Sequence, residues 1–103
     1  MAEIIWTEPA LENLNDIAEY IAINNISAAE KLVDNVFSTV NRLELFPKSG
    51  PVPEEIADFD YREVIINPCR VLYKIEGNFV YILHVLRQER KLRKYILNEI
   101  KNG

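Results

Sequence analysis

Hydrophobic residues recur every three or four positions in two N-terminal stretches of the chain, and each stretch predicts an amphipathic helix. The first runs from residue 8 to about Ile23, with Thr7 as its N-cap and a proline in its first turn. The second begins at Ser27, which forms a capping box with Glu30, and it ends at Phe46, before a proline. We expect the two helices to form an antiparallel hairpin.

Four shorter stretches are rich in β-branched and aromatic residues and predict strands at residues 2–6, 61–66, 69–75 and 79–85. The tight-turn signal Gly77-Asn78 joins the last two, so the three later strands should form an antiparallel meander. Continued without interruption, the register of this turn places Leu72 opposite Leu83 and Arg70 opposite Val85. Both faces of this strand pair are largely apolar, and a helical hairpin can cover only one of them.

The C-terminal stretch is basic and also has a helical pattern. Leu92, Tyr95, Ile96 and Ile100 lie at helical spacing, which predicts a third amphipathic helix. The expected order is therefore β-α-α-β-β-β-α within one domain spanning residues 1–103. This is an α+β fold in which an N-terminal strand and a helical hairpin pack on a mainly antiparallel sheet.

Composition narrows the classes of function. With 103 residues, 49% of them hydrophobic, the chain has the apolar content of one compact core. One cysteine, Cys69, and one histidine, His84, provide neither a disulfide nor a zinc site, so we expect no metal and no cofactor. Neither residue lies in a catalytic motif, which predicts an inert thiol and a packed imidazole. The absence of a signal sequence and of a membrane span favours a cytoplasmic protein without a membrane partner.

Charge divides the chain into two parts. Residues 1–60 carry twelve acidic and three basic side chains, whereas residues 61–103 carry four acidic and nine basic ones. The net charges are −9 and +5, although the whole chain has a net charge of only −4. We therefore expect one end of the domain to be electropositive and to attract phosphates or an acidic partner.

Five motifs, in order along nearly the whole chain, resemble the RelE/ParE toxin superfamily of bacterial type II toxin–antitoxin modules, its ParE branch in particular. They are residues 6–10 (WTEPA), 43–50 (LELFPKSG), 61–64 (YREV), 69–73 (CRVLY) and 80–85 (VYILHV). The resemblance implies an α+β fold and a small, ParD-like antitoxin that wraps the toxin and covers the second face of the sheet. It also implies two activities: ParE-like members, among them plasmid-stabilisation toxins, poison DNA gyrase, whereas RelE-like members cut mRNA on the ribosome.

The first hypothesis is a ParE-like toxin that inhibits gyrase by binding and has no catalytic residue. Its target- or antitoxin-binding surface is predicted from five cations, Arg70, Arg87, Arg90, Lys91 and Lys94. The resemblance places a functional arginine at Arg70, and the predicted register would bring Arg87 onto the same face of the sheet. The last four cations would share one helix face. The structural alternatives are an ion pair between Arg70 and Glu63, and a helix face that is merely solvated.

The alternative hypothesis is a ribosome-dependent mRNA endonuclease. In it, Arg62 and Arg70 hold the scissile phosphate, and Tyr95 or Glu89 transfers protons. The sequence departs from the RelE-like pattern at Val64, where a second lysine is expected, and the tail has no terminal histidine or tyrosine. A third interpretation is an inactive member of the superfamily that is retained to bind the antitoxin.

Overall fold

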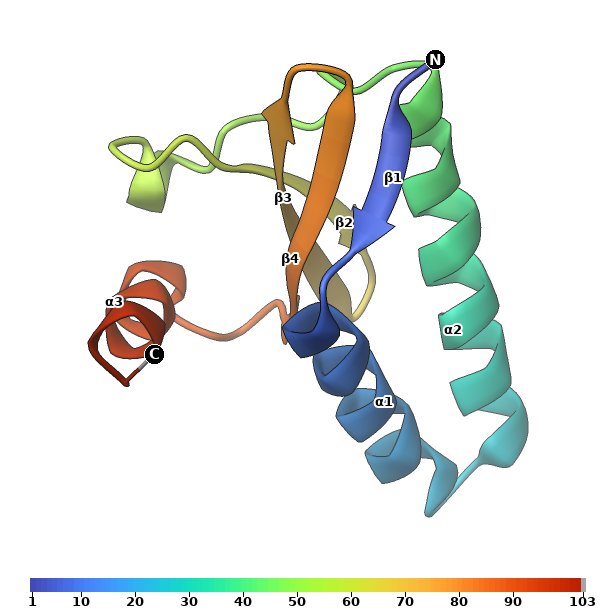
Figure 1. Cartoon of the computed structure of the whole chain (residues 1–103). Helices are drawn as coiled ribbons and strands as arrows, with labels where there is room; N and C mark the ends of the chain where they lie inside the picture. Colours follow the sequence, from blue (N-terminus) through green and yellow to red (C-terminus); the bar gives the residue numbers. More distant parts are fainter. Residues whose placement is uncertain (103) are drawn as a thin grey trace.

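The chain folds into a mixed four-stranded sheet with helices on both of its sides (Figure 1). The computed structural model describes residues 1–102 and the side chains as far as residue 99. The elements are β1 (Glu3–Trp6), α1 (Glu8–Ala22), α2 (Ile26–Asn41), the 3-10 turns η1 (Arg42–Glu44) and η2 (Glu54–Ile56), β2 (Arg62–Ile66), β3 (Cys69–Glu76), β4 (Phe79–Arg87) and α3 (Leu92–Asn102). The predicted element order and α+β class are confirmed. The side chain of Ile100, an expected apolar position of α3, lies outside the described residues.

The strands lie in the order β1-β4-β3-β2. β2, β3 and β4 form the predicted antiparallel meander, whereas β1 pairs in parallel with β4. The sheet is therefore mainly antiparallel. The first strand of the sequence, β1, lies at one edge of the sheet beside the last strand, β4. None of the described helices is both long and apolar enough to cross a membrane.

The helical hairpin forms as expected, but two of its predicted boundaries are wrong. Thr7 caps α1, since its side chain accepts a hydrogen bond from the amide of Ala10. The cap of α2 is Asn25, not Ser27: the Asn25 backbone is extended and its Oδ1 accepts from the Ala28 amide at 3.0 Å. Helix α2 also ends at Asn41, because the next three residues tighten into a 3-10 turn before Pro47.

Two hydrophobic clusters occupy opposite faces of the sheet. The larger one lies between the sheet and the α1–α2 hairpin and includes the fully buried Val36, Val40, Val71, Tyr73 and Ile82. The smaller one lies under η2 and α3 and consists of Ile56, Leu72, Leu86, Leu92 and Ile96. Figure 1 shows α3 on the side of the sheet away from the hairpin. The second cover, which the resemblance assigned to the antitoxin, thus comes in part from the chain itself.

A β-bulge changes the predicted register between β3 and β4. The pairs from Glu76–Phe79 to Tyr73–Ile82 are as predicted, but Leu83 has no partner and Leu72 faces His84. Helix α1 satisfies backbone groups around the bulge: Thr7 Oγ1 donates to the carbonyl of Ile82 at 2.6 Å. Beyond the bulge every β4 side chain is on the face opposite to the predicted one, because strand faces alternate with a period of two.

The loop before β2 is fixed by a close contact with the sheet. The Tyr73 hydroxyl accepts a hydrogen bond from the Gly50 amide at 3.0 Å and donates to the carbonyl of Pro47 at 2.7 Å. A Cβ atom at position 50 would lie 2.6 Å from this hydroxyl and would also collide with the carbonyl of Glu63. Only glycine allows the loop to approach so closely.

Substituting Gly50→Ala should therefore lower the free energy of unfolding by about 2 kcal/mol, since the new methyl group meets backbone that cannot easily move. Thermal or urea denaturation measures the change. The neighbouring exposed Ser49→Ala is the control and should change the stability by less than about 0.5 kcal/mol. Equal stability of the two variants would contradict this account of the loop.

Candidate functional site

Arg70 lies on the face of the sheet that η2 and α3 cover, here called the outer face. Only 8% of the residue is exposed. Its Nε donates to Glu63 at 2.8 Å, and its Nη2 and Nη1 donate to the two carboxylate oxygens of Glu55 at 3.0 and 3.3 Å. The ion pair with Glu63 is the structural alternative considered from the sequence, and Glu55 adds a second carboxylate. Both edges of the guanidinium fork are thus filled by the chain's own acids.

Arg87 does not join Arg70 on one face, so this prediction is wrong. The bulge places Arg87 opposite Cys69, whose side chain lies in the core under the helical hairpin. Arg87 therefore points toward α1, where its guanidinium lies 5.7 Å from the ring centre of Tyr20 and its Nε pairs with Glu89 at 2.9 Å. The two arginines lie on opposite faces of the sheet.

The basic residues before α3 also fail to form one helix face, because the helix begins only at Leu92. Arg87 ends β4, and Arg90 lies in the following turn, where its guanidinium stacks 5.4 Å from the ring centre of Tyr95. These two arginines line one pocket between α1, the end of β4 and α3. Lys91 and Lys94 are exposed. Arg87 and Arg90 thus come together without a common helix, in a pocket that Asp16 also lines.

The other residues of the nuclease hypothesis do not converge with Arg70. Arg62 donates through Nη1 to the carbonyls of Lys48 and Gly50, at 3.2 and 2.8 Å, and so holds the loop before β2. Glu89 is exposed; a hydrogen bond from its own backbone amide and one from Arg87 lower the pKa of its carboxyl. An acid with a lowered pKa is poorly suited to donate a proton at neutral pH.

His84 and Cys69 are both packed side chains; the packed imidazole is confirmed, and the inert thiol stays a prediction that the burial of Cys69 supports. The ring of His84 meets Tyr95 edge-on, with Nδ1 3.5 Å from the tyrosine hydroxyl, and burial lowers the pKa of the imidazole. Burial raises the pKa of the Cys69 thiol, so the unreactive protonated form dominates. Among the described residues, no three His, Cys, Asp or Glu side chains gather closely enough to hold a metal ion.

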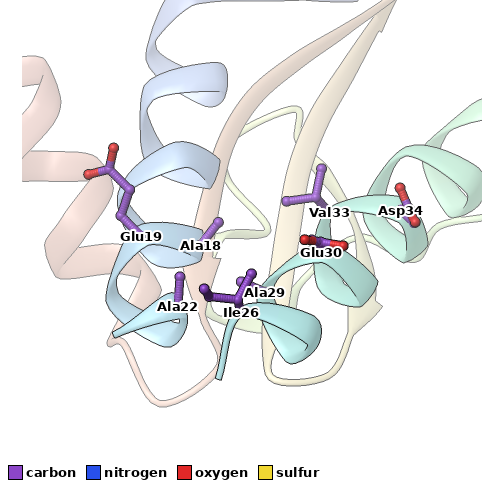
Figure 2. A pocket seen from close by; sticks show the side chains of 8 residues that line it. All are labelled: Ala18, Glu19, Ala22, Ile26, Ala29, Glu30, Val33 and Asp34. Carbon is purple, nitrogen blue, oxygen red and sulfur yellow. The ribbon is translucent and has the colours of Figure 1, made fainter. Parts of the chain in front are cut away.

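A second candidate surface was not predicted from the sequence. A groove of about 400 Å³ runs between α1 and α2 toward the tip of the hairpin. Figure 2 shows Ala18 and Ala22 of α1 facing Ile26 and Ala29 of α2. The alanine side chains are too small to fill the space between the two helices, and this leaves the groove open. The four-residue spacing of Ala18 and Ala22 is the one signal in the sequence that could have indicated this groove.

The rim of this groove is acidic. Glu19 lies on the α1 side and Glu30 and Asp34 on the α2 side (Figure 2), and no basic side chain lines it. An apolar floor with a negative rim suits an apolar segment that is flanked by lysine or arginine.

The Arg70 cluster should contribute strongly to stability. Glu63→Gln removes one partner of a buried ion pair, and we expect the free energy of unfolding to fall by about 3 kcal/mol. Glu76→Gln is the matched control, because it removes the surface pair with Lys74 (2.9 Å) and should cost less than about 1 kcal/mol. Urea denaturation compares the two variants, and a loss at Glu63 no larger than at Glu76 would contradict the role given to the cluster.

Comparison with known proteins places the chain among bacterial toxins. ParE3 of Caulobacter vibrioides is 28% identical over 87 residues, covering 84% of this chain and 86% of that toxin. RelE2 of the same organism is 26% identical over 91 residues, covering 87% and 99%. Both relatives match along most of their length, so similarity alone does not separate the two branches.

The fold agrees with solved structures. A chain of the chromosomal ParDE system from P. aeruginosa superposes with a TM-score of 0.72 at 22% identity, covering 86% of this chain and 98% of that one. One of the RelBE2 complex from Mycobacterium tuberculosis gives 0.54 at 19% identity, covering 84% and 98%. The family model described as the ParE toxin of the type II toxin–antitoxin system parDE matches residues 4–92. The chain therefore belongs to the ParE toxin family of type II toxin–antitoxin systems.

Proposed function

We propose that the protein is a cytoplasmic toxin that inhibits DNA gyrase by binding to it and is neutralised by a cognate, ParD-like antitoxin. The family model that spans residues 4–92 supports the ParE branch. Gyrase as the target rests on the resemblance to that branch. No catalytic step is needed for this activity.

The state of Arg70 is the observation that favours binding over RNA cleavage. A ribonuclease of this superfamily would need Arg62 and Arg70 free to hold the scissile phosphate. Here Arg70 is enclosed by Glu55 and Glu63, and Arg62 is bonded to two loop carbonyls. Arg70 offers no open edge to a phosphate and Nη1 of Arg62 is committed to the loop, so the phosphorane would lack the stabilising contribution of Arg70.

We place the gyrase-binding surface on the basic segment from Arg87 to Lys94, which leads from β4 into α3. Arg90, Lys91 and Lys94 are exposed there, and Arg87 is partly exposed. Long cationic side chains on this segment raise the rate of encounter with an acidic partner surface and fix its orientation. Arg70 lies beneath Glu55 on the outer face of the sheet, where its own carboxylate partners enclose it, so the proposed gyrase-binding surface does not include it.

The triple reversal Arg90→Glu, Lys91→Glu and Lys94→Glu should abolish inhibition of gyrase in a supercoiling assay, because it replaces the attractive field with a repulsive one. The matched control reverses Lys31, Arg42 and Lys48, which are exposed in the acidic part of the chain, and should keep inhibition within about twofold. Circular dichroism checks that both variants fold. Full inhibition by the first variant would refute this surface.

The same assay tests the target. Wild-type protein should reduce supercoiling or trap broken DNA, and added antitoxin should reverse this. If gyrase stays active while transcripts are cut on translating ribosomes, the mRNA endonuclease hypothesis replaces the present one. If neither effect occurs but the antitoxin still binds, the protein is an inactive scaffold.

We assign the groove between α1 and α2 to the antitoxin. Its apolar floor around Ala18, Ala22 and Ile26 would take the apolar face of an antitoxin helix, and Glu30 and Asp34 would pair with basic residues flanking that face. The two solved structures that share this fold come from a ParDE toxin–antitoxin system and a RelBE2 toxin–antitoxin complex, which supports a partner of this class.

Filling the groove should separate antitoxin binding from toxicity. Ala22→Trp should weaken antitoxin binding at least about tenfold in a titration calorimetry experiment, because the indole occupies the space of the partner side chain. Gyrase inhibition should be unchanged. Asn35→Trp, an exposed position of α2 that does not line the groove, is the control. Undiminished binding to Ala22→Trp would rule out this site.

A further inference from the structure

The two carboxylates that hold Arg70 differ in how firmly the fold fixes them. Glu63 lies on β2 within the sheet, and its side chain is 12% exposed. Glu55 belongs to the 3-10 turn η2, and its side chain is 46% exposed. Glu63 therefore covers the inner edge of the guanidinium, and Glu55 covers the edge that faces solvent.

Glu55 contacts Arg70 as an external phosphate would. Its two oxygens accept from Nη1 and Nη2, which is the parallel, two-bond geometry in which arginine also binds phosphate. With Glu55 in place, one guanidinium is shared by two carboxylates and the cluster has a net charge of −1. An approaching phosphate would meet an occupied fork and a negative charge.

The segment that carries Glu55 is anchored independently of this ion pair. Ile56 is fully buried in the smaller hydrophobic cluster, and Asp58 accepts two hydrogen bonds from Arg93 of α3, at 2.7 and 2.9 Å. Arg93 also stacks on Phe59, with 5.8 Å between its guanidinium carbon and the ring centre. The position of η2 does not depend on Glu55, so this carboxylate is free to serve another role.

We propose that Glu55 is a specificity residue that acts as an internal substitute for a phosphate group, closing Arg70 to nucleic acid and restricting the toxin to protein partners. Without the Glu55 carboxylate, the outer edge of Arg70 becomes an open, partly desolvated anion site on the outer face of the sheet. A phosphodiester of single-stranded RNA fits this site, because it offers two oxygens to the two exposed N–H groups. The inference depends on the Arg70 cluster and not on gyrase being the target.

The test compares the full-length wild type with Glu55→Gln in fluorescence anisotropy with a fluorescein-labelled single-stranded RNA oligonucleotide. Glu55→Gln should bind about tenfold more tightly than the wild type, because one charge-assisted, two-bond contact becomes available. The gain should shrink between about 50 and about 200 mM salt, as expected of a phosphate contact. Equal affinity of the two folded proteins would overturn the proposal.

Two matched variants exclude a general charge effect. Glu54→Gln makes the same change at the exposed neighbouring residue of η2 and should leave RNA binding within about twofold of the wild type. The triple variant Glu55→Gln, Glu63→Gln and Arg70→Gln has the same cluster charge as Glu55→Gln but no guanidinium, and it should lose the gain.

The proposal is also wrong if Glu54→Gln gains as much affinity as Glu55→Gln, or if the triple variant keeps the gain. Thermal denaturation shows whether each variant is folded. If the triple variant does not fold, the comparison of Glu54→Gln with Glu55→Gln still decides the question. A gyrase assay on the wild type tests the proposed function separately, since either result can occur without the other.

Discussion

The unpaired residue of β4, Leu83, is the constraint that decides which side chains face the helical hairpin and which face α3. Because Leu83 is extra, Val85 turns into the core under the helical hairpin and Leu86 turns toward α3. Neither hydrophobic cluster would be complete in the uninterrupted register. The bulge is held by α1, whose Asn13 Oδ1 accepts a hydrogen bond from the amide of Val85 at 3.1 Å and whose cap Thr7 bonds to β4. Helix α1 and strand β4 thereby determine each other's geometry.

The same bulge separates the arginines and so shapes the chemistry. Arg70 remains on the outer face, where burial obliges it to find carboxylate partners, while Arg87 is carried to the side of α1. A buried guanidinium with two acids is costly to assemble, and it persists only where the geometry satisfies its donors. The acidic segment before β2 supplies one of these partners and ties α3 to the sheet through Asp58 and Arg93. The charge segregation along the sequence is thus partly cancelled in space.

Two surfaces of opposite charge remain exposed to a partner. The segment between β4 and α3 presents exposed cations, and the helical hairpin has a groove with an acidic rim. The chain shares its fold with both ParE and RelE toxins, so the fold cannot decide between their activities. In our proposal the distinction lies in side chains: Glu55 closes an arginine that would otherwise be open to phosphate.

Sequence determined which segments form helices and strands, the order of these elements and the family. It could do so because hydrophobic periodicity, caps such as Thr7 and the Gly77-Asn78 turn each act over only a few residues. It also offered Glu63 as a structural alternative for the partner of Arg70, since the two residues lie on neighbouring strands, and the structure contains this pair. Only the tertiary structure decided the bulge at Leu83, the encounter of Glu55 with Arg70 and the groove between the helices. These depend on contacts between residues distant along the chain, where one unpaired residue reverses every face that follows it.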